Sequence, residues 1–319
     1  MSKTVKVFSP ATIGNIGPGF DVLGLAIKGM GDIVEVWKTS NDKIVIEEIL
    51  NADHDISKDP DKNTAGIAAR EVLRLLKIKQ GIGMRIDKGM PAGSGLGSSA
   101  ASAAAAAYAV SKLFDDKLSK MDLILPATLA EEYVSGGFFA DNVAPALLGG
   151  ATLTRSSVPL DVTHLGNISD LIIVLALPNI QILTKDARDI LPSDVNMNNF
   201  VGNMANACLI ASAFSTDNYK LFSRSLKDTV IEPVRSKLIP GFLEVKAVAL
   251  EAGADGMTIS GAGPAVFAIT NEKKKAPIIE DAMARTFKKN GIDCRTLVTT
   301  PSHKGSLQVT SDDFDFFDH

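Results

Sequence analysis

The part of this sequence best suited to chemistry is the glycine- and serine-rich segment 91–101, PAGSGLGSSAA. Its three glycines stand at alternate positions, so the backbone there can take positive φ angles and approach another group closely. An alanine-rich run of high helix propensity follows, at residues 102–114. The first N–H groups of a helix have no partner inside it and lie at the positive end of its dipole. We therefore expect a phosphate-binding loop that leads into a helix, and favour it over an ordinary tight turn.

Two serines, Ser98 and Ser99, close this segment. We expect them to cap the helix and still offer hydroxyls to a ligand. The segment is not a Walker A loop, because no lysine follows its last glycine. The glycine spacing does not fit a dinucleotide-binding fingerprint either, and the catalytic signatures of protein kinases are missing.

The segment resembles the P-x-x-x-G-L-G-S-S-A motif of the GHMP kinases, which phosphorylate small hydroxylated metabolites with ATP. Asn63 precedes a predicted amphipathic helix at residues 64–76 and is a natural N-cap; in the family a residue near this position lines the adenine pocket. Capping alone would also explain it. The resemblance implies an ATP site made of Asn63, Pro91, Ala92, Gly93, Ser94, Gly95, Leu96, Gly97, Ser98, Ser99, Ala100 and Ala101.

A second stretch, residues 9–21, holds three glycines and two prolines and is predicted to be a loop. Its polar residues Asn15 and Asp21 could simply satisfy turns. The stretch also resembles the first motif of the family, especially in the homoserine kinase branch, where an asparagine and an aspartate contact the substrate. The resemblance therefore favours a substrate-binding role for both residues.

A third stretch, DNVAPALLGG at residues 141–150, closely resembles the homoserine kinase branch. It implies a catalytic or substrate-binding role for Asn142. Asp141 corresponds to an aspartate proposed as the general base of mevalonate kinases, and a structural role for it stays open. Many relatives carry a histidine just before this pair, whereas this chain has Phe138, Phe139 and Ala140.

A magnesium site is expected from Glu131, which lies near the end of a predicted helix at residues 119–134. A carboxylate there opposes the helix dipole, which suggests that a cation is nearby. Mg²⁺ takes few protein ligands, and the resemblance implies that Ser98 and Glu131 supply them. Glu131, Asp141 and Asn142 are accordingly the predicted catalytic residues.

An amino-acid alcohol would need a guanidinium for its carboxylate and oxygen atoms for its ammonium. Arg188 and Arg235 stand in segments that resemble the carboxylate-binding ones of the family, although a surface ion pair is the alternative for each. Asp21, Asn15 and Asn142 could receive the ammonium. This combination favours an amino-acid substrate, and the resemblance implies ATP-dependent phosphorylation of the side-chain hydroxyl of L-homoserine, with Mg²⁺, in threonine biosynthesis.

Composition narrows the possible partners. Of the 319 residues 45% are hydrophobic, and the net charge of -4 gives no support for binding nucleic acid. The two cysteines, Cys208 and Cys294, suggest neither a disulfide framework nor a zinc site and suit the cytoplasm. We expect no secretion signal and no membrane-spanning segment. A homodimer is the assembly that the sequence leaves open.

The fold class expected from the resemblance is α+β, in two domains. Residues 1–160 would form an ATP-binding domain like the second domain of ribosomal protein S5, and residues 161–319 a ferredoxin-like domain. Strands are predicted at residues 22–27 and 32–37, with a turn at residues 28–31 between them. A second glycine turn, at residues 261–264, resembles the third family motif, which supports the phosphate loop in relatives.

Two other functions stay open. One is another GHMP kinase with a sugar or a mevalonate-like substrate, and the other is a non-enzymatic sensor on the same fold. RNA binding, suggested by the S5-like half, is disfavoured by the acidic balance and the lack of a basic patch.

Overall fold

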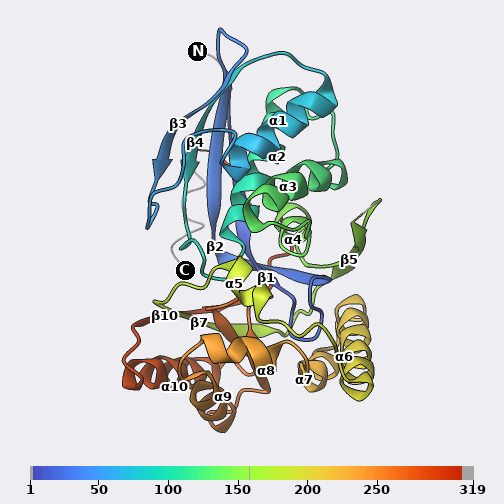
Figure 1. Ribbon diagram of the computed structural model, residues 1–319, viewed down its shortest axis with the longest axis vertical. Helices are drawn as coiled ribbons and strands as arrows, with labels where there is room; N and C mark the ends of the chain where they lie inside the picture. Colours follow the sequence, from blue (N-terminus) through green and yellow to red (C-terminus); the bar gives the residue numbers. More distant parts are fainter. Residues whose placement is uncertain (1–2, 158, 311–319) are drawn as a thin grey trace.

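The computed structural model describes residues 3–157 and 159–310, so the acidic, aromatic run at residues 312–318 lies outside the described residues. Two sheets organise the chain, one above the other in Figure 1, each with helices packed against it. The architecture is the expected two-domain α+β fold. Within the described residues, no helix combines the length and the apolar character needed to cross a bilayer.

Within the described ranges, the upper sheet has seven strands: β1 (Thr4–Gly14), β2 (Leu23–Lys38), β3 (Ile44–Leu50), β4 (Ile82–Asp87), β5 (Ala151–Ser157), β6 (Leu160–Gly166) and β11 (Leu307–Gln308). The main path runs β11-β1-β2-β4-β3, and the β5–β6 hairpin pairs with β2. Four helices gather on one side of this sheet in both ribbon views: α1 (Thr64–Leu76), α2 (Ser98–Leu113), α3 (Lys120–Ser135) and α4 (Val143–Leu148).

Two predictions about strands were wrong. Residues 9–14 continue β1 and are not part of the following loop, and β2 runs through residues 28–31, where a turn was predicted. Gly31 allows β2 to pack closely against β1, because a Cβ on Gly31 would lie 2.3 Å from the carbonyl oxygen of Ser9. Along this part of β2, the register of its pairing with β1 shifts, between Pro10 and Thr12 of β1.

Helix α2 is the core of the upper domain. It begins at Ser98, four residues earlier than predicted, and its alanines at positions 100–107 are buried. A buried alanine adds little bulk, so the helix can lie close to β1, β2 and the neighbouring helices α1 and α3. The start of the helix is thereby fixed against the sheet.

The lower sheet has four strands, β7 (Ile172–Pro178), β8 (Gly256–Ile259), β9 (Val266–Thr270) and β10 (Cys294–Thr299), in the order β10-β7-β9-β8. Helices α9 (Phe242–Glu251) and α10 (Ala276–Lys289) pack together on one face. The remaining helical segments are α5 (Thr184–Asp189), α6 (Met197–Ser215), α7 (Tyr219–Ser225), α8 (Glu232–Arg235) and a 3-10 turn at Ser236–Leu238.

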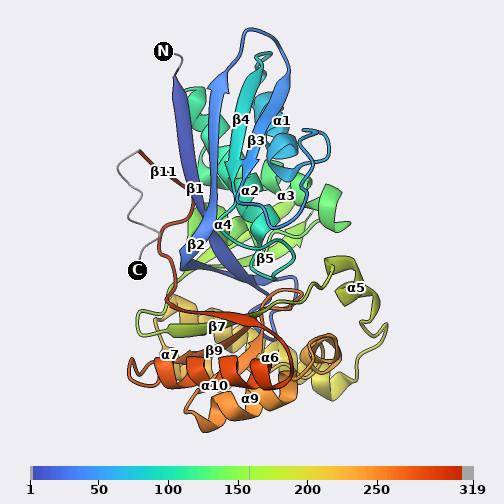
Figure 2. The ribbon, with the colours of Figure 1, turned by 90° about the vertical axis from the view of Figure 1, so that its left-hand side faces the viewer.

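The chain crosses between the domains twice. The division expected after residue 160 falls at the start of β6, which still pairs with β5 of the upper sheet; we propose residues 167–171 as the boundary. After β10 the chain returns to the upper domain, where β11 pairs with the edge strand β1 (Figure 2). The lower and upper domains are therefore joined by two separate connections.

Candidate active site

The cleft between the two domains forms a cavity of about 490 Å³. Residues from the predicted phosphate, metal and substrate sites all line this one cavity. The lining residues used below are Asn15, Asp21, Asn63, Lys88, Gly93, Gly95, Gly97, Ser98, Ser99, Ser102, Glu131, Phe139, Asp141, Asn142, Arg188 and Arg235.

The predicted phosphate loop stands at one end of this cleft. Gly93, Gly95 and Gly97 all have positive φ angles, of 64°, 83° and 67°. Gly97 is the N-cap of α2 and offers no side chain, so Ser98 and Ser99 do not cap the helix as predicted. Both serines already lie inside its first turn. The loop therefore delivers uncapped backbone N–H groups to the cleft, an arrangement suited to an anion.

The loop is bonded to the second glycine turn of the lower domain. The backbone N–H of Ala265 donates to the Ser94 carbonyl at 2.9 Å, and the Ser260 hydroxyl donates to the Gly95 carbonyl at 2.7 Å. A Cβ at Gly95 would lie 2.6 Å from the Ser260 carbonyl oxygen and 2.8 Å from that of Gly263. The close approach that the sequence predicted for Gly95 is therefore made, in this structure, to the backbone of the other domain.

Asn63 is held by the protein at both ends of its amide. As predicted, it is the N-cap of α1: its Oδ1 accepts from Ala65 N at 3.0 Å, and its Nδ2 donates to the Ser57 carbonyl at 2.9 Å. The residue still lines the cleft, together with Ile56 and Ile86. Apolar side chains of this kind suit the flat face of a nucleotide base.

Ser98 and Glu131, the predicted metal ligands, both line the cleft next to the start of α2. The Ser98 hydroxyl is inaccessible to water and has no hydrogen-bond partner within the described part of the chain. Glu131 accepts a hydrogen bond of 2.9 Å at Oε2 from the Ser99 hydroxyl. Burial raises the pKa of Glu131 to about 7, and the Ser99 bond and the charge of Lys88 oppose that rise.

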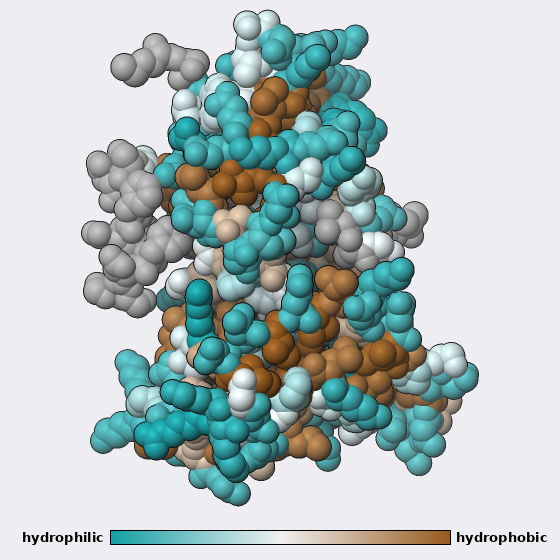
Figure 3. All heavy atoms as spheres, turned by 60° about the vertical axis from the view of Figure 1, so that its left-hand side comes forward, coloured by the Kyte–Doolittle hydropathy of each residue, from teal (hydrophilic) through white to brown (hydrophobic). Residues whose placement is uncertain are grey.

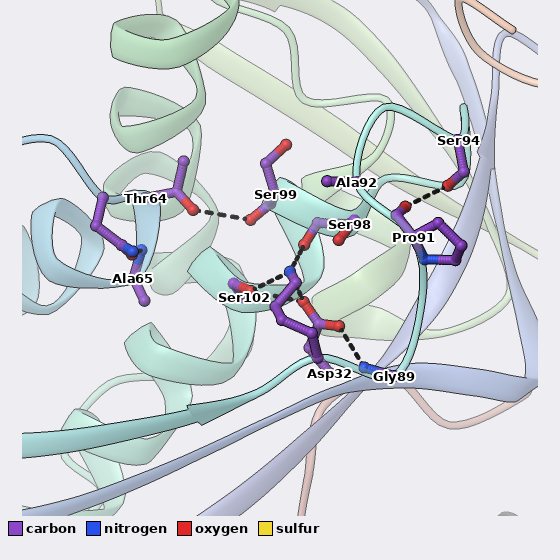
Figure 4. A network of polar contacts seen from close by, with 12 residues as sticks. Asp32, Thr64, Ala65, Gly89, Pro91, Ala92, Ser94, Ser98, Ser99 and Ser102 are labelled. Carbon is purple, nitrogen blue, oxygen red and sulfur yellow. Dashed lines mark hydrogen bonds and ion pairs between the residues drawn. The ribbon is translucent and has the colours of Figure 1, made fainter. Parts of the chain in front are cut away.

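A buried ion pair beneath the loop escaped the sequence analysis. Lys88 follows β4 directly and contacts Asp32 of β2, with Asp32 wholly inaccessible to water. Figure 4 shows Asp32, Ser98, Ser102 and Gly89 around this point. Burial raises the pKa of Asp32, while Lys88 opposes the rise. The only sequence signal was a charged residue between a strand and a glycine loop, which would ordinarily be assigned to solvent.

Asp141 and Asn142 both line the cleft. Thr12 donates a hydrogen bond of 2.9 Å to Oδ1 of Asn142, which fixes the orientation of that amide. Asp141 is buried, and burial together with repulsion by Asp21 raises its pKa to about 7. A buried carboxyl with such a pKa can change protonation near neutral pH.

The predicted substrate residues Asp21 and Arg188 form an ion pair with each other. Two parallel hydrogen bonds, of 3.0 and 2.9 Å, join the guanidinium to the carboxylate. The guanidinium lies 4.0 Å from the ring centre of Phe139 and 5.2 Å from that of Phe20. Phe139 thus stacks on this arginine near the position where many relatives carry a histidine, a contact that the sequence did not predict.

Arg235, the second predicted carboxylate ligand, is only 3% exposed. It donates to the Ala187 carbonyl at 3.1 Å and to the Gly261 carbonyl at 3.0 Å, and burial lowers its pKa. Asn15 also donates to Gly261, at 2.8 Å, and its Oδ1 accepts from the backbone N–H of Asp21 at 3.0 Å. In this structure Asn15 holds Asp21 in place, with both ends of its amide engaged.

The comparisons with known proteins agree along the chain. Residues 63–150 match the model of the family described as "GHMP kinases N terminal domain", and residues 210–289 match that of "GHMP kinases C terminal". The chain is 44% identical to a homoserine kinase of Methanococcus maripaludis, over 85% of this chain and 89% of that one. It is 43% identical to a homoserine kinase of Arabidopsis thaliana, over 90% of this chain and 80% of that one.

A solved structure extends this similarity to three dimensions. The crystal structure of a homoserine kinase from Cytophaga hutchinsonii matches with a TM-score of 0.92 at 39% identity, over 97% of this chain and 98% of that one.

Proposed function

The chain belongs to the GHMP kinase family, within its homoserine kinase branch, and from this premise we propose how its cleft works. The reaction is ATP-dependent phosphorylation of the side-chain hydroxyl of L-homoserine, which gives O-phospho-L-homoserine for threonine biosynthesis. The phosphate loop receives the triphosphate, and the opposite end of the cleft receives the amino acid.

The observation that carries the substrate assignment is the balanced charge at that opposite end. Two arginines, Arg188 and Arg235, face two aspartates, Asp21 and Asp141, in one partly buried group. A zwitterion has no net charge and carries one group for each sign, so it can join this arrangement without adding an unpaired charge. Mevalonate would bring a carboxylate alone, and a sugar would bring neither charge.

Within this arrangement each charged group of homoserine has a defined place. The carboxylate binds Arg235 and the outer edge of Arg188, because guanidinium groups bind carboxylates in a planar, bidentate manner. The ammonium binds Asp21 and the Asn142 amide oxygen. Asn15 positions Asp21, and the Phe20 and Phe139 rings both contact the Arg188 guanidinium.

A magnesium site fits the residues at the start of α2. The buried Ser98 hydroxyl, which has no hydrogen-bond partner among the described residues, and the carboxylate of Glu131 are hard oxygen ligands of the kind that Mg²⁺ prefers. Bound there with ATP, Mg²⁺ supplies charge stabilisation for the transferred phosphoryl group. Ser98 and Glu131 would hold it, and Ser99 would orient Glu131 through the 2.9 Å hydrogen bond.

The proton of the homoserine hydroxyl goes to Asp141 in this proposal. Its pKa of about 7 gives the carboxylate a useful affinity for a proton while leaving much of it ionised at neutral pH. The neighbouring Asn142, fixed by Thr12, orients the hydroxyl for transfer. We place this reaction in the cytoplasm, in keeping with the two cysteines, Cys208 and Cys294, both of which are free.

The proposal is tested with a substrate panel. Purified protein is incubated with Mg-ATP and, separately, with L-homoserine, other amino-acid alcohols, mevalonate and sugars, and ADP release is followed. L-homoserine should give the highest kcat/KM. Faster turnover of mevalonate or of a sugar would contradict the substrate assignment, and ATP binding without turnover of any of them would indicate a sensor.

We also propose a homodimer, supported by an apolar surface on α6. Met197, Phe200, Val201 and Met204 of this helix are 48–69% exposed. Figure 3 shows apolar side chains gathered over the lower, C-terminal part of the molecule. Light scattering should give twice the chain mass of 33.7 kDa, and Phe200→Glu should halve that value; a wild-type monomer would refute the proposal.

A further inference from the structure

A lysine beneath the phosphate loop connects the sheet to the first turn of α2. Lys88 is buried and follows the last residue of β4. Its ammonium contacts the Asp32 carboxylate and donates to the Ser102 hydroxyl at 2.8 Å and to the Ser98 carbonyl at 3.1 Å. One side chain thus joins strand β2 to both ends of the helix's opening turn.

The anchor of this lysine is itself fixed. Oδ1 of Asp32 accepts from the backbone N–H of Gly89 at 3.1 Å, and Oδ2 accepts from the Ser102 hydroxyl at 2.6 Å. Gly89 packs directly on β2, since a Cβ on it would lie 2.0 Å from the Gly31 carbonyl oxygen. The ammonium of Lys88, which contacts Asp32, is therefore held at a defined point relative to the sheet; Figure 4 shows Asp32, Gly89 and Ser102 at this point.

The position of the Lys88 ammonium determines the position of Ser98, to which it donates a hydrogen bond. Its carbonyl receives the hydrogen bond from Lys88, while its hydroxyl is buried at the cleft without a protein partner in the described ranges. Carbonyl and hydroxyl belong to one residue at the start of α2, so a shift of the carbonyl also moves the hydroxyl and the N–H groups of the first turn. An error of about 1 Å in such a position is enough to slow transfer strongly.

The ion pair contributes position more than charge. Asp32 offsets much of the charge of Lys88 at the point of contact, and the remaining effect on this end of the cleft is the attraction that opposes the rise in the Glu131 pKa. A buried ion pair also stabilises a fold no better than well-packed apolar groups of the same volume. We therefore expect the ion pair to contribute mainly by positioning Ser98.

We propose that Lys88, held by Asp32 and Ser102, is a positioning residue for phosphoryl transfer: its hydrogen bond to the Ser98 carbonyl sets the Ser98 hydroxyl and the opening turn of α2 against Mg-ATP. This role presupposes the kinase reaction proposed above. The unaltered protein is therefore assayed in parallel, and its failure to phosphorylate homoserine would refute the reaction without bearing on Lys88.

The decisive variant removes both charges at once. Lys88→Met alone would leave Asp32 buried without its partner, so a loss of activity could reflect unfolding. In the double variant Asp32→Asn/Lys88→Met, the asparagine can still accept from Gly89 and bond Ser102, and the methionine fills the volume of the lysine stem. The ammonium's hydrogen bond to the Ser102 hydroxyl is also lost, but the asparagine remains as a partner of Ser102, whereas the bond to the Ser98 carbonyl has no replacement.

Three quantities are measured for this double variant: its melting temperature, the Kd of Mg-ATP by calorimetry, and kcat and KM with homoserine. We expect a melting temperature close to that of the wild type and an unchanged KM for homoserine. The Kd of Mg-ATP should rise, or kcat should fall, by about 10- to 100-fold, as is typical when a residue that orients a ligand-binding group is lost. Wild-type values of both Kd and kcat in the folded double variant would overturn the proposal.

A control and a second variant complete the test. Lys112→Met removes a lysine from the other end of the same helix, where it pairs with the partly exposed Asp116, and should leave Kd and kcat unchanged. If the double variant does not fold, Ser102→Ala removes one anchor of Lys88 while keeping the ion pair. Ser102→Ala should then weaken Mg-ATP binding or kcat without raising the KM for homoserine, and wild-type kinetics would refute the role of Lys88.

Discussion

The two ends of the cleft are built in opposite ways. The end that we propose for the phosphates is a continuous stretch of eleven positions, 91–101, which offers backbone groups and has glycines at positive φ angles. The end that we propose for homoserine is an assembly of long side chains, with Asp21 and Arg188 separated by 167 positions in the chain. Function should therefore fail at the first end when atoms are added, and at the second end when atoms are removed.

The strongest expected effect comes from adding a side chain at Gly97. Its φ of 67° is strained for any other residue, and a Cβ there would lie 2.2 Å from the Thr12 hydroxyl and 2.9 Å from Oδ1 of Asn142. Gly97→Val should abolish Mg-ATP binding and lower kcat/KM by at least about 1,000-fold. Calorimetry and steady-state kinetics would show this.

Gly136 offers a matched control for that substitution. It also has a positive φ, of 73°, but a Cβ there meets nothing within 4 Å. Gly136→Val should cost some stability through backbone strain and leave nucleotide affinity unchanged. Normal affinity in Gly97→Val would contradict the phosphate-loop assignment.

Removing a guanidinium tests the other end. Arg235→Ala and Arg188→Ala should each lower kcat/KM for homoserine by roughly thirty-fold to several-thousand-fold, the range for truncating one partner of a desolvated charge pair. The effect should be larger at Arg235, because Arg188 is the more exposed of the two. The Kd of Mg-ATP should hardly change.

Lysine variants sharpen this prediction. Arg188→Lys and Arg235→Lys keep the charge but lose the planar pair of donors, so they should rescue activity poorly. Full rescue by lysine would show that charge alone is recognised.

Glu131→Gln should reduce kcat by about 10- to 100-fold, the usual cost of impairing a metal site, while the KM for homoserine changes little. The amide can still accept from Ser99, so the helix should remain intact. Glu132 is exposed and provides the neighbouring control. A damaging Glu132→Gln together with a mild Glu131→Gln would move the metal ligand by one residue.

The raised pKa of Asp141 predicts that the stability of the protein depends on pH. The pKa of Asp141 is about 7 in the folded protein and 3.8 in the unfolded chain. Between pH 3.8 and pH 7 the folded state therefore holds a proton on Asp141 that the unfolded state has lost. The ionised group therefore destabilises the protein as pH rises through this range. Asp141→Asn should be more stable than the wild type at pH 8, by on the order of 4 kcal/mol at most, and nearly equal to it at pH 4.

Calorimetric unfolding at the two pH values checks this, and Asp217 provides a contrast. The Ser169 hydroxyl lowers the pKa of that exposed carboxylate, so Asp217→Asn should lose stability at pH 8 and lose little at pH 3. An Asp141→Asn protein whose stability difference from the wild type does not grow with pH would contradict the buried, raised-pKa carboxyl.

The same contrast explains what could be predicted from the sequence. The loop at 91–101 was recognisable because its contacts are local and its spacing reflects backbone geometry directly. The Asp21–Arg188 pairing was not, since each residue suggested its own contact with substrate and nothing local shows that they meet. Phe139 stacking on Arg188 escaped prediction for the same reason.

Local rules also failed at two particular places. The glycines near residues 29–31 suggested a turn, but β2 continues through them, with Gly29 at a φ of 82° and Gly31 packed against Ser9 of β1. The sequence analysis assigned no role to Lys88, because its partner Asp32 lies on another strand and no local pattern indicates the pairing. In both cases the deciding partner lies far away along the chain.

The most direct test of the two-ended cleft compares L-homoserine with 4-hydroxybutyrate, which has the same hydroxyl and carboxylate but no ammonium. In the wild type, kcat/KM should be larger for homoserine by at least about 30-fold, the smallest loss expected for a buried charge contact. Asp21→Asn should remove most of that preference while leaving the Kd of Mg-ATP unchanged. If the wild-type protein phosphorylates both compounds equally well, the assignment of an amino-acid site to the Asp21–Arg188 end is wrong.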